Sequence, residues 1–397
     1  MENLFKKHIE KVQITKTTFI RDLTNEIFWD ERLIGIKGQR GTGKTTLLLQ
    51  YIKQNFKPDG TNLYVSMDDL YFSENRLVDL VDDFVKNGGT YLFLDEVHRY
   101  KNWAQEIKNI YDDYPGLNIV FTGSSILHIS TAKADLSRRA MIYQMTGLSF
   151  REYLNFILKL DFNTYSLSEI LSDHVDIAME ITKKTKPIKY FKTYLESGYF
   201  PFFKEYPKTY LQRVEEIINL IIDIDLFVLK DFNQISIGKI KQLLYIIAQS
   251  SPFKPNIKKL SERIGINRNT LVTYLHYLNE AKIINSLFSD TFGIGALQKP
   301  DKIYLENPNF IYALENEKPN IGNIRETFFM NQLSYKHKVT HSKQTDFAVN
   351  NKYIFEVGGK YKTNRQIAGT DNSYIAADDI EYGFRNKIPL WLFGFLY

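Results

Sequence analysis

A short glycine-rich stretch carries the clearest chemistry in this sequence. Residues 38–45 read Gly-Gln-Arg-Gly-Thr-Gly-Lys-Thr, which is the spacing G-x-x-x-x-G-K-T. Glycines let the backbone curl without side chains in the way, so that several N–H groups point inward and form an anion nest. The lysine of such a loop reaches the β- and γ-phosphates of a nucleotide, and the next hydroxyl ligates Mg²⁺. The pattern therefore predicts a nucleoside triphosphate site, with Lys44 and Thr45 in these two roles.

The segments on either side of this loop have the order that the motif requires. Residues 33–36 form a short apolar run typical of a buried strand, and residues 45–56 carry apolar side chains near helical spacing. A helix that begins at the loop offers its free N–H groups and the positive end of its dipole to the same anion. We therefore expect the loop and the first helical turn to bind the nucleotide, through Gly38, Gly41, Thr42, Gly43, Lys44, Thr45 and Thr46.

An adjacent pair of acids forms the second candidate group. Asp95 and Glu96 follow the apolar run 91–94, which fits a buried parallel strand whose carboxyl end carries chemistry. In a magnesium–nucleotide site the first acid holds the metal, directly or through water. The second acid acts as general base on the attacking water. We therefore predict Asp95 as a metal ligand and Glu96 as the base.

Two serines follow the next expected strand, at 118–122. A hydroxyl at Ser124 or Ser125 has the position needed to sense the γ-phosphate. Either serine also fits the N-cap of a following helix, so both interpretations stay open. Ser124 is the candidate site residue of the two.

Strands and helices alternate through the first part of the chain. Strands are predicted at 62–67 and 140–145 in addition to those above, and helices at 73–86 and 102–113, the former with Ser73 as its N-cap. Such alternation implies a parallel sheet with helices on both faces, an α/β domain.

Residues 30–155 resemble the prokaryotic AAA-type ATPases that carry a C-terminal nuclease-like domain of unknown function. The resemblance rests on the glycine loop, the acid pair, and the segments TGSS at 122–125, LSRR at 136–139 and GLSFREY at 147–153. It extends over nearly the whole chain, because KPDKIY at 299–304 resembles the C-terminal domain of the same family. It implies ATP rather than GTP as the nucleotide. It also implies that Arg139 is an arginine finger, which stabilises charge on the transferring phosphoryl group across a subunit interface. Arg138 stands where the family usually has glycine and is the alternative finger, and an ordinary surface arginine pair is the alternative to both.

Positive charge is concentrated in one segment. The chain has a net charge of +5, whereas residues 239–282 hold eight Lys or Arg and two Glu. Such a patch favours an acidic partner, of which nucleic acid is the usual one. The same segment predicts a winged helix-turn-helix, with helices at 239–249, 257–264 and 269–280 and a wing strand from 283. Candidate DNA contacts are Arg268, Lys258 and Lys259, and the alternative is a winged helix that packs only against protein.

The last segment, residues 299–397, has acids in the order of a restriction-endonuclease-like site. Glu326 lies on a predicted helix, and Asp346 and Glu356 lie on predicted strands. Two such carboxylates hold Mg²⁺ in these nucleases, and a lysine poises the water. Position 358 is glycine where that lysine belongs, and Lys360 shares the face of Glu356 only if the chain stays extended. The pattern therefore favours the nuclease fold over nuclease activity.

Composition limits the remaining possibilities. The sequence has no Cys, which excludes disulfides and thiolate metal sites. It shows no signal-peptide core and no uninterrupted apolar run of membrane-spanning length, so we expect a cytoplasmic protein. We predict a P-loop domain at 1–148, a helical linker at 149–238, the winged helix at 239–298 and the nuclease-like domain at 299–397.

The predicted function is that of an ATP-binding protein, a Mg²⁺-dependent ATPase coupled to DNA or to a partner protein, which includes a second copy of the chain. The first alternative is a nucleotide-gated DNA-binding regulator with little turnover. The second is a Mg²⁺-dependent nuclease driven by ATP.

Overall fold

The computed structural model describes residues 1–125, 136, 138–226, 234–249, 252–289, 299–315, 318–342, 344–363, 365, 367 and 369–397. The chain divides into two compact units, Met1–Thr146 and Gly147–Tyr397. A finer division of the second unit at residues 238 and 298 stays a prediction. In the described part of the chain, no helix is both long enough and apolar enough to span a bilayer.

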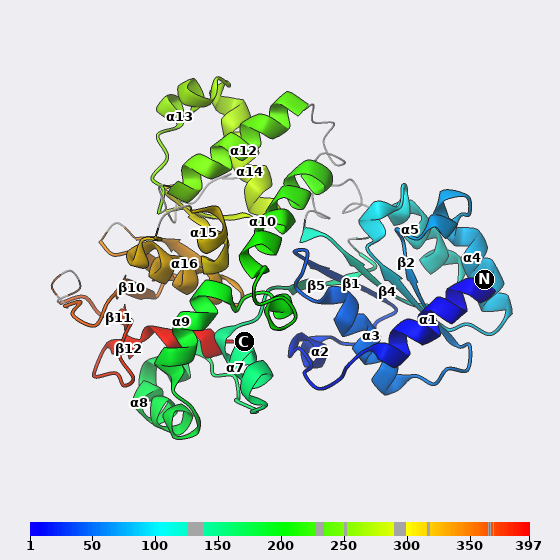
Figure 1. Ribbon diagram of the computed structural model, residues 1–397, viewed down its shortest axis with the longest axis horizontal. Coiled ribbons are helices and arrows are strands. Elements are labelled where there is room, and N and C mark those ends of the chain that lie inside the picture. Colours follow the sequence, from blue (N-terminus) through cyan, green and yellow to red (C-terminus); the bar gives the residue numbers. More distant parts are fainter. Residues whose placement is uncertain are drawn as a thin grey trace. The chain divides into compact units, whose positions relative to one another are not determined.

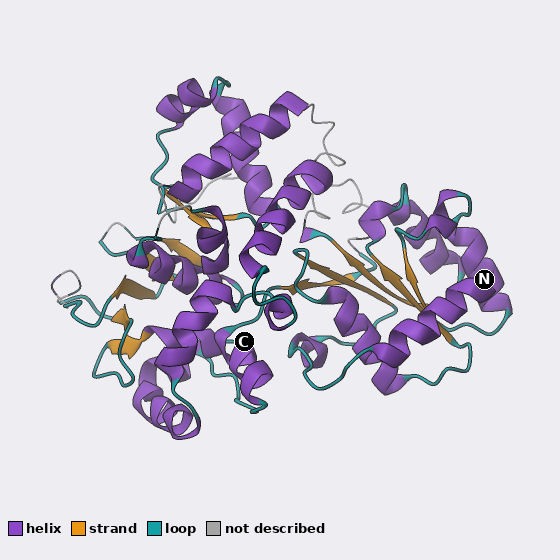
Figure 2. Cartoon of the chain, viewed as in Figure 1, coloured by secondary structure: helices purple, strands orange, loops and turns teal. Residues whose placement is uncertain are grey.

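A five-stranded parallel sheet forms the centre of the first unit. Its strands lie in the order β2-β3-β4-β1-β5, and every neighbouring pair is parallel, which confirms the predicted α/β sheet (Figure 2). Because all five strands run the same way, their carboxyl ends meet at one edge. The strands are β1 (Leu33–Gly38), β2 (Asn62–Ser66), β3 (Tyr91–Asp95), β4 (Asn118–Gly123) and β5 (Met141–Met145).

Helices cover both faces of this sheet, because successive strand residues point to opposite sides. On one face Ile36, Phe93 and Val120 pack with α3, and on the other Leu94 and Phe121 pack with α4 and α5 (Figure 1). The helical segments are α1 (Glu2–Ile14), α2 (Leu23–Glu26), α3 (Lys44–Asn55), η1 (Leu70–Ser73), α4 (Leu77–Lys86), η2 (Val97–Arg99) and α5 (Trp103–Asp113).

Helix α1 protects the edge strand β2. Nδ1 of His8, a buried residue of α1, accepts a hydrogen bond from the Tyr64 N–H at 3.0 Å. An edge strand otherwise presents unpaired backbone groups, so this bond satisfies one of them. Burial lowers the pKa of His8 to about 4, which keeps the ring neutral and able to accept.

The prediction that Ser73 caps a helix over 73–86 is wrong. Helix α4 begins only at Leu77, and its N-cap residue makes no side-chain hydrogen bond. Ser73 instead ends the short turn η1, where its hydroxyl donates to the Leu70 carbonyl at 2.6 Å. Asp69 caps that turn by accepting from the Tyr71 N–H, so a separate turn forms before the helix.

The second unit contains most of the helices. Its fixed points include Asn309, whose side chain accepts from the Tyr199 N–H at 2.8 Å and donates to the Leu195 carbonyl at 2.8 Å. The carbonyl of Tyr397 accepts from the Ser149 hydroxyl at 2.6 Å. The Asn309 bonds join residues 195 and 199 to residue 309, and the last bond joins residue 149 to residue 397. The helices are α7 (Phe150–Leu158), α8 (Leu167–Lys184), α9 (Pro187–Ser197), α10 (Tyr210–Leu220), α12 (Gln234–Gln249), α13 (Ile257–Ile264), α14 (Arg268–Glu280), α15 (Pro308–Leu314) and α16 (Ile321–Ser334), with the short segments η4 (Pro201–Lys204), η5 (Ile221–Leu226) and η7 (Leu390–Phe395).

Two sheets complete this unit. A mixed sheet has the order β12-β11-β10-β9-β8, antiparallel from β8 to β10 and parallel from β10 to β12. Helix α16 packs on it, with the rings of Phe329 and Phe355 5.0 Å apart. A second sheet pairs β6 with β7 across the boundary predicted at residue 298. The strands are β6 (Ile284–Leu287), β7 (Lys302–Leu305), β8 (Val339–His341), β9 (Phe347–Val349), β10 (Tyr353–Gly358), β11 (Ser373–Ala377) and β12 (Lys387–Pro389).

Candidate nucleotide-binding site

The glycine loop joins the carboxyl end of β1 to α3 in the first unit. Gly41 and Gly43 have φ angles of +79° and +99°, which side-chain-bearing residues rarely adopt. Gly38 lies so close to β5 that a Cβ there would be 2.3 Å from the Met145 carbonyl oxygen. Helix α3 begins at Lys44, so its free N–H groups face the loop. The loop therefore has the shape of an anion nest at a helix N-terminus.

Lys44 is folded over this loop. Its Nζ donates to the carbonyls of Gly38 at 2.9 Å and Gln39 at 3.0 Å, and lies 3.8 Å from Oε1 of Glu96. The side chain is only 4% exposed, so its charge is held close to the nest. The loop thus holds one buried cation at the point where phosphates would enter.

Arg21 supports the loop from behind, and sequence reasoning missed it. Its Nη1 donates to the Thr42 carbonyl at 2.9 Å and its Nη2 to the Thr146 carbonyl at 3.0 Å. Arg21 is buried, and the Thr42 hydroxyl is used inside the loop, where it donates to the Gln39 carbonyl. Thr46 lies exposed on the first turn of α3. No local pattern around residue 21 predicts this support, because both bonds reach distant segments.

Asp95 is the centre of a buried hydrogen-bond network. Its Oδ2 accepts from the Thr45 hydroxyl at 2.7 Å and from the Tyr64 hydroxyl at 2.8 Å, while Oδ1 accepts from the Thr122 hydroxyl. Burial, and then the Asp95 charge, raise the pKa of Tyr64, so its phenol stays a donor. The structure thus brings together the two predicted metal ligands, Thr45 and Asp95. Tyr64 and Thr122 are additions that the sequence did not assign.

Glu96 directly follows β3 and has an unusual backbone conformation. Its φ is +57°, and its N–H donates to the Thr122 hydroxyl at 3.0 Å, which holds this backbone turn. The carboxylate lies between two cationic or polar neighbours: Oε1 faces Lys44, and Oε2 is 3.5 Å from Nε2 of His98. The side chain is 20% exposed, so it is accessible to water.

His98 connects Glu96 to Ser124. Nδ1 of His98 accepts from the Ser124 N–H at 3.3 Å, which leaves Nε2 as the protonated nitrogen that faces Glu96. Ser124 and Ser125 are both buried. The alternative role of these serines as a helix N-cap concerns residues 126–135, which lie outside the described residues.

Arg139 makes a two-pronged ion pair within the first unit. Its Nε and Nη2 lie 2.9 Å from Oδ1 and Oδ2 of Asp112, near the end of α5. Arg138 is exposed. The structure therefore holds the candidate finger against its own unit, with 29% of its side chain exposed.

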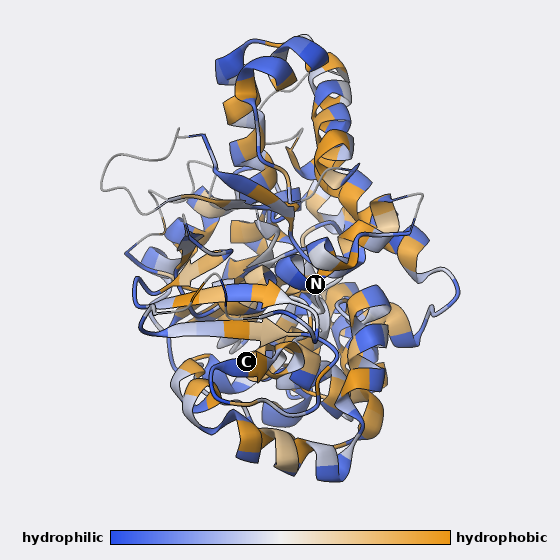
Figure 3. Cartoon of the chain, turned by 90° about the vertical axis from the view of Figure 1, so that its left-hand side faces the viewer, coloured by the Kyte–Doolittle hydropathy of each residue, from blue (hydrophilic) through white to orange (hydrophobic). Residues whose placement is uncertain are grey.

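The helix-turn-helix segment of the second unit has the predicted turn, and α13 has the predicted bounds, whereas α12 begins at Gln234 and α14 at Arg268, five residues and one residue earlier than predicted. Gly265 has a φ of +72°, and the Asn267 side chain accepts from the Thr270 N–H at 2.8 Å to begin α14. Lys258, Lys259 and Arg268 are exposed, and Figure 3 shows hydrophilic residues gathered at the α13 end of these helices. The predicted apolar stripe of α14 is buried: Leu271, Tyr274, Leu275 and Leu278.

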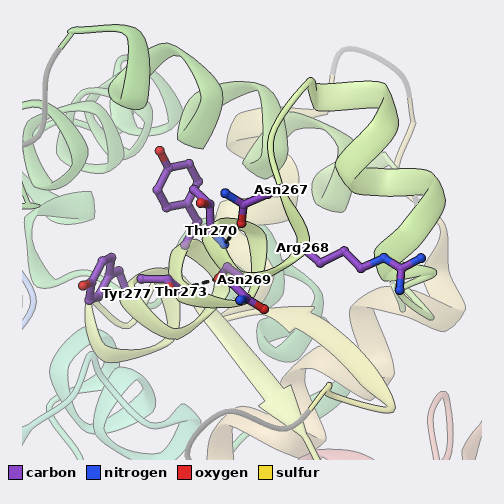
Figure 4. A pocket seen from close by; sticks show the side chains of 7 residues that line it. Asn267, Arg268, Asn269, Thr270, Thr273 and Tyr277 are labelled. Atoms are coloured by element: carbon purple, nitrogen blue, oxygen red, sulfur yellow. Dashed lines mark hydrogen bonds between the residues drawn. The ribbon is translucent and has the colours of Figure 1, made fainter.

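An open hollow of about 710 Å³ lies beside the start of α14. Amide, hydroxyl and phenol groups line it, and in Figure 4 Arg268 extends away from Asn269, Thr273 and Tyr277. The Thr273 hydroxyl donates back to the Asn269 carbonyl at 2.9 Å. The full lining is Asn267, Arg268, Asn269, Thr270, Thr273, Tyr274 and Tyr277.

The acids of the last segment form no triad. The structure brings Glu326 and Asp346 together, with Lys302 of β7 near both. Glu356 pairs instead with Nζ of Lys362, at 2.6 Å. The possibility that Lys360 serves Glu356 is not realised, because the chain turns after Gly358, where the Lys362 N–H bonds to the Gly359 carbonyl.

Two family models match parts of this chain. Residues 30–154 match the family model of the AAA domain, and residues 188–320 match a domain of unknown function, DUF8612. The AAA match, the parallel sheet and the glycine loop together support an AAA-type P-loop ATPase, a class that binds and hydrolyses nucleotide.

A relative among curated proteins is the uncharacterized protein MJ1637 of Methanocaldococcus jannaschii. It is 27% identical over 272 residues, which cover 65% of this chain and 57% of the relative. The chain thus spans little more than half of that protein.

ORC1 of Aeropyrum pernix in complex with DNA is one of the solved structures that are similar to this chain. The identity is 10%, the TM-score is 0.33, and the match covers 77% of this chain and 91% of that one. AMPPCP-bound DnaA of Aquifex aeolicus has 14% identity and a TM-score of 0.25, and the match covers 66% of this chain and 86% of DnaA. PCH-2 of C. elegans has 16% identity and a TM-score of 0.25, and the match covers 40% of this chain and 45% of PCH-2.

Proposed function

We propose that this protein is a Mg²⁺-dependent ATPase whose turnover is coupled to DNA binding. The observation that carries the ATPase proposal is the 2.7 Å hydrogen bond between the Thr45 hydroxyl and the Asp95 carboxylate, next to Lys44 and Glu96. Hydroxyl and carboxylate oxygens are the ligands that Mg²⁺ prefers, so these residues fit the ion. Bound there, the ion would neutralise charge on the β- and γ-phosphates.

The loop and its neighbours have separate tasks in this proposal. The loop N–H groups and the start of α3 receive the phosphates, and Lys44 exchanges its two carbonyl partners for phosphate oxygens. Glu96 orients the attacking water and accepts its proton at a carboxylate oxygen. His98 is a positioning residue, because its Nε2 faces Glu96 while the Ser124 N–H holds its other nitrogen. Gly38, Gly41, Thr42, Gly43 and Thr46 shape the nest.

Arg139 is proposed to act on a neighbouring copy of the chain. An arginine finger reaches the γ-phosphate of the adjacent subunit, where it stabilises charge in the transition state. In the single chain its guanidinium is paired with Asp112. Assembly would then exchange this partly exposed ion pair, which contributes little stability, for a phosphate contact.

The DNA contact is proposed at α13 and α14. Lys258, Lys259 and Arg268 are exposed cations, and within the described ranges none of them forms an ion pair. Cations of this kind bind phosphates, and each phosphate contact adds to the salt dependence of binding. Asn269 and Thr273 lie on the adjacent face of α14, where amide and hydroxyl groups can contact base edges.

Phosphate release measured with and without duplex and single-stranded DNA tests both parts. We expect DNA to accelerate release by the wild type but not by K258A/K259A/R268A. A matched control replaces three exposed lysines between the last turn of α8 and the first turn of α9, as K183A/K186A/K189A, with the same change in charge. In DNA binding, each lost phosphate contact should reduce the slope of log K against log salt concentration by about 0.9. Equal stimulation of both triple variants would reject the DNA surface, and no release from Mg-ATP under any condition would reject the ATPase.

A nucleotide-gated DNA-binding regulator with little turnover is the second candidate. The pairing of Arg139 with Asp112 favours it, because a single chain then lacks a finger at its nucleotide. This candidate predicts slow phosphate release at every protein concentration, together with DNA affinity that differs between the ATP-bound and ADP-bound forms. Release that rises steeply with protein concentration would instead favour the assembled ATPase.

A further inference from the structure

Three charged side chains meet inside the second unit. Nζ of Lys302, on β7, lies 3.4 Å from Oδ1 of Asp346 and 3.5 Å from Oε2 of Glu326. Asp346 directly precedes β9, and Glu326 lies on α16. The lysine side chain is 8% exposed, and those of Glu326 and Asp346 are 16% and 18% exposed. The ammonium group is thus largely enclosed beside both carboxylates.

The remaining contacts hold the two carboxylates in place. Oε2 of Glu326 also accepts from the Tyr304 hydroxyl at 2.7 Å, and Oδ2 of Asp346 accepts from the Val357 N–H at 3.0 Å. Burial, and then the charge of Asp346, raise the pKa of Glu326, whereas Lys302 acts in the opposite direction. The lysine therefore offsets a repulsion between two acids that the fold brings together.

This arrangement differs from a divalent metal site. Mg²⁺ binds carboxylate oxygens at about 2.0–2.1 Å and needs room for further ligands, including waters. Here an ammonium group occupies the position beside both acids. Within the described ranges, no three His, Asp or Glu side chains are grouped as metal ligands, and Glu356 is engaged by Lys362. The residues present therefore do not fit the ion that a restriction-endonuclease-like site requires.

We propose that Lys302 takes the place of a divalent cation between Glu326 and Asp346. The second unit then holds a metal-independent charge cluster at this position and does not cleave nucleic acid with Mg²⁺. This inference rests on the second unit alone and is independent of the proposed ATPase, which uses residues of the first.

Manganese binding to the full chain without nucleotide tests the proposal, with spectroscopic or calorimetric counting of bound ions. The substitution Lys302→Met removes the charge and keeps a similar length, so it leaves two enclosed carboxylates without their cation. We expect K302M to gain one Mn²⁺ site with affinity about tenfold or more above any binding of the wild type at that position. The triple variant K302M/E326Q/D346N, which lacks both carboxylates, should lose this gained ion.

The wild type provides a second measurement that does not depend on the folding of K302M. The pair substitution E326Q/D346N should leave the number of Mn²⁺ ions bound by the wild type unchanged. Loss of an ion in that variant would overturn the proposal, and so would Mg²⁺-dependent cleavage of plasmid that E326Q abolishes. A folded K302M that gains no Mn²⁺ would also overturn it.

Discussion

The hydroxyl of Thr45 donates to Oδ2 of Asp95 at 2.7 Å, across a separation of 50 residues in the sequence. This bond joins the first turn of α3 to the end of β3. Because Tyr64 and Thr122 donate to the same carboxylate, three strands and one helix meet at Asp95. The oxygens proposed to hold Mg²⁺ are thus placed before any ligand arrives, which reduces the cost of ordering them.

Replacing Thr45 with alanine should weaken nucleotide binding only when magnesium is present. The variant loses the proposed metal ligand and keeps the loop, so ATP should bind wild type and T45A similarly in excess chelator. With Mg²⁺ we expect at least about a tenfold loss of affinity in T45A, measured by calorimetry. Thr90→Ala removes an exposed hydroxyl of the same unit and serves as control. Equal loss with and without Mg²⁺ would assign Thr45 to the loop rather than to the metal.

Glu96→Gln should separate binding from turnover. The amide has the shape of the carboxylate but cannot accept the proton of the attacking water, so phosphate release should fall by about 10²-fold or more. Affinity for Mg-ATP should stay equal or increase, because a negative charge near the phosphates is removed. Glu74→Gln, at an exposed position, is the matched control. Wild-type turnover in E96Q would retire the assignment of Glu96 as base.

Some of the site follows from the sequence because its signals are local. The loop residues are consecutive, and the turn between α13 and α14 is specified by Gly265 and by the caps Asn256 and Asn267, each within three residues of its partner. Helix bounds there agree with the prediction at 257–264 for this reason. The parallel sheet of the first unit was likewise predictable from the alternation of strands and helices.

Other site residues depend on strand order, which no local pattern gives. Tyr64 and Thr122 reach Asp95 because β2 and β4 flank β3, an arrangement visible only once the sheet is assembled. Lys302 meets Asp346 from 44 residues away, on a strand of a different sheet. The turn after Gly358 brings Lys362 rather than Lys360 to Glu356, because the chain does not stay extended there. In each case tertiary packing selects the partner.

His8 should make the first unit less stable in acid. Its pKa is about 4 when folded and 6.5 when exposed, so below 6.5 the unfolded chain takes up a proton that the folded chain refuses. The contribution of His8 to the free energy of unfolding is fully present above pH 6.5. It falls as the pH drops toward 4, by about 3 kcal/mol at most. His8→Asn keeps an acceptor for the Tyr64 N–H and cannot titrate in this range.

Urea unfolding at about pH 7.5 and about pH 5 measures this effect. Two of the three tryptophans, Trp29 and Trp103, lie in the first unit, so W391F leaves fluorescence that reports on it alone. In that background the wild-type His8 should lose more stability between the two pH values than H8N does. An identical loss in both proteins would remove His8 as the cause.

Glu306 should give the second unit the opposite dependence on pH. It is buried, its Oε2 has no hydrogen-bond partner among the described residues, and burial raises its pKa to about 7. The folded chain therefore holds a proton that the unfolded chain releases near 4.5. The contribution of Glu306 to the free energy of unfolding is fully present below pH 4.5. It is lost as the pH rises through 7, by about 3 kcal/mol at most.

Glu306→Gln is neutral throughout and should abolish this loss, so E306Q should be more stable than the wild type at about pH 8 and similar to it at about pH 4.5. Trp391 in a W29F/W103F background reports on the second unit. Glu196→Gln removes an exposed carboxylate of the same unit and should leave the pH dependence unchanged.

Because His8 and Glu306 act with opposite signs, acid should weaken the first unit while it strengthens the second. A second unit whose wild-type stability increases between pH 5 and pH 8, with E306Q following the same curve, would contradict this account.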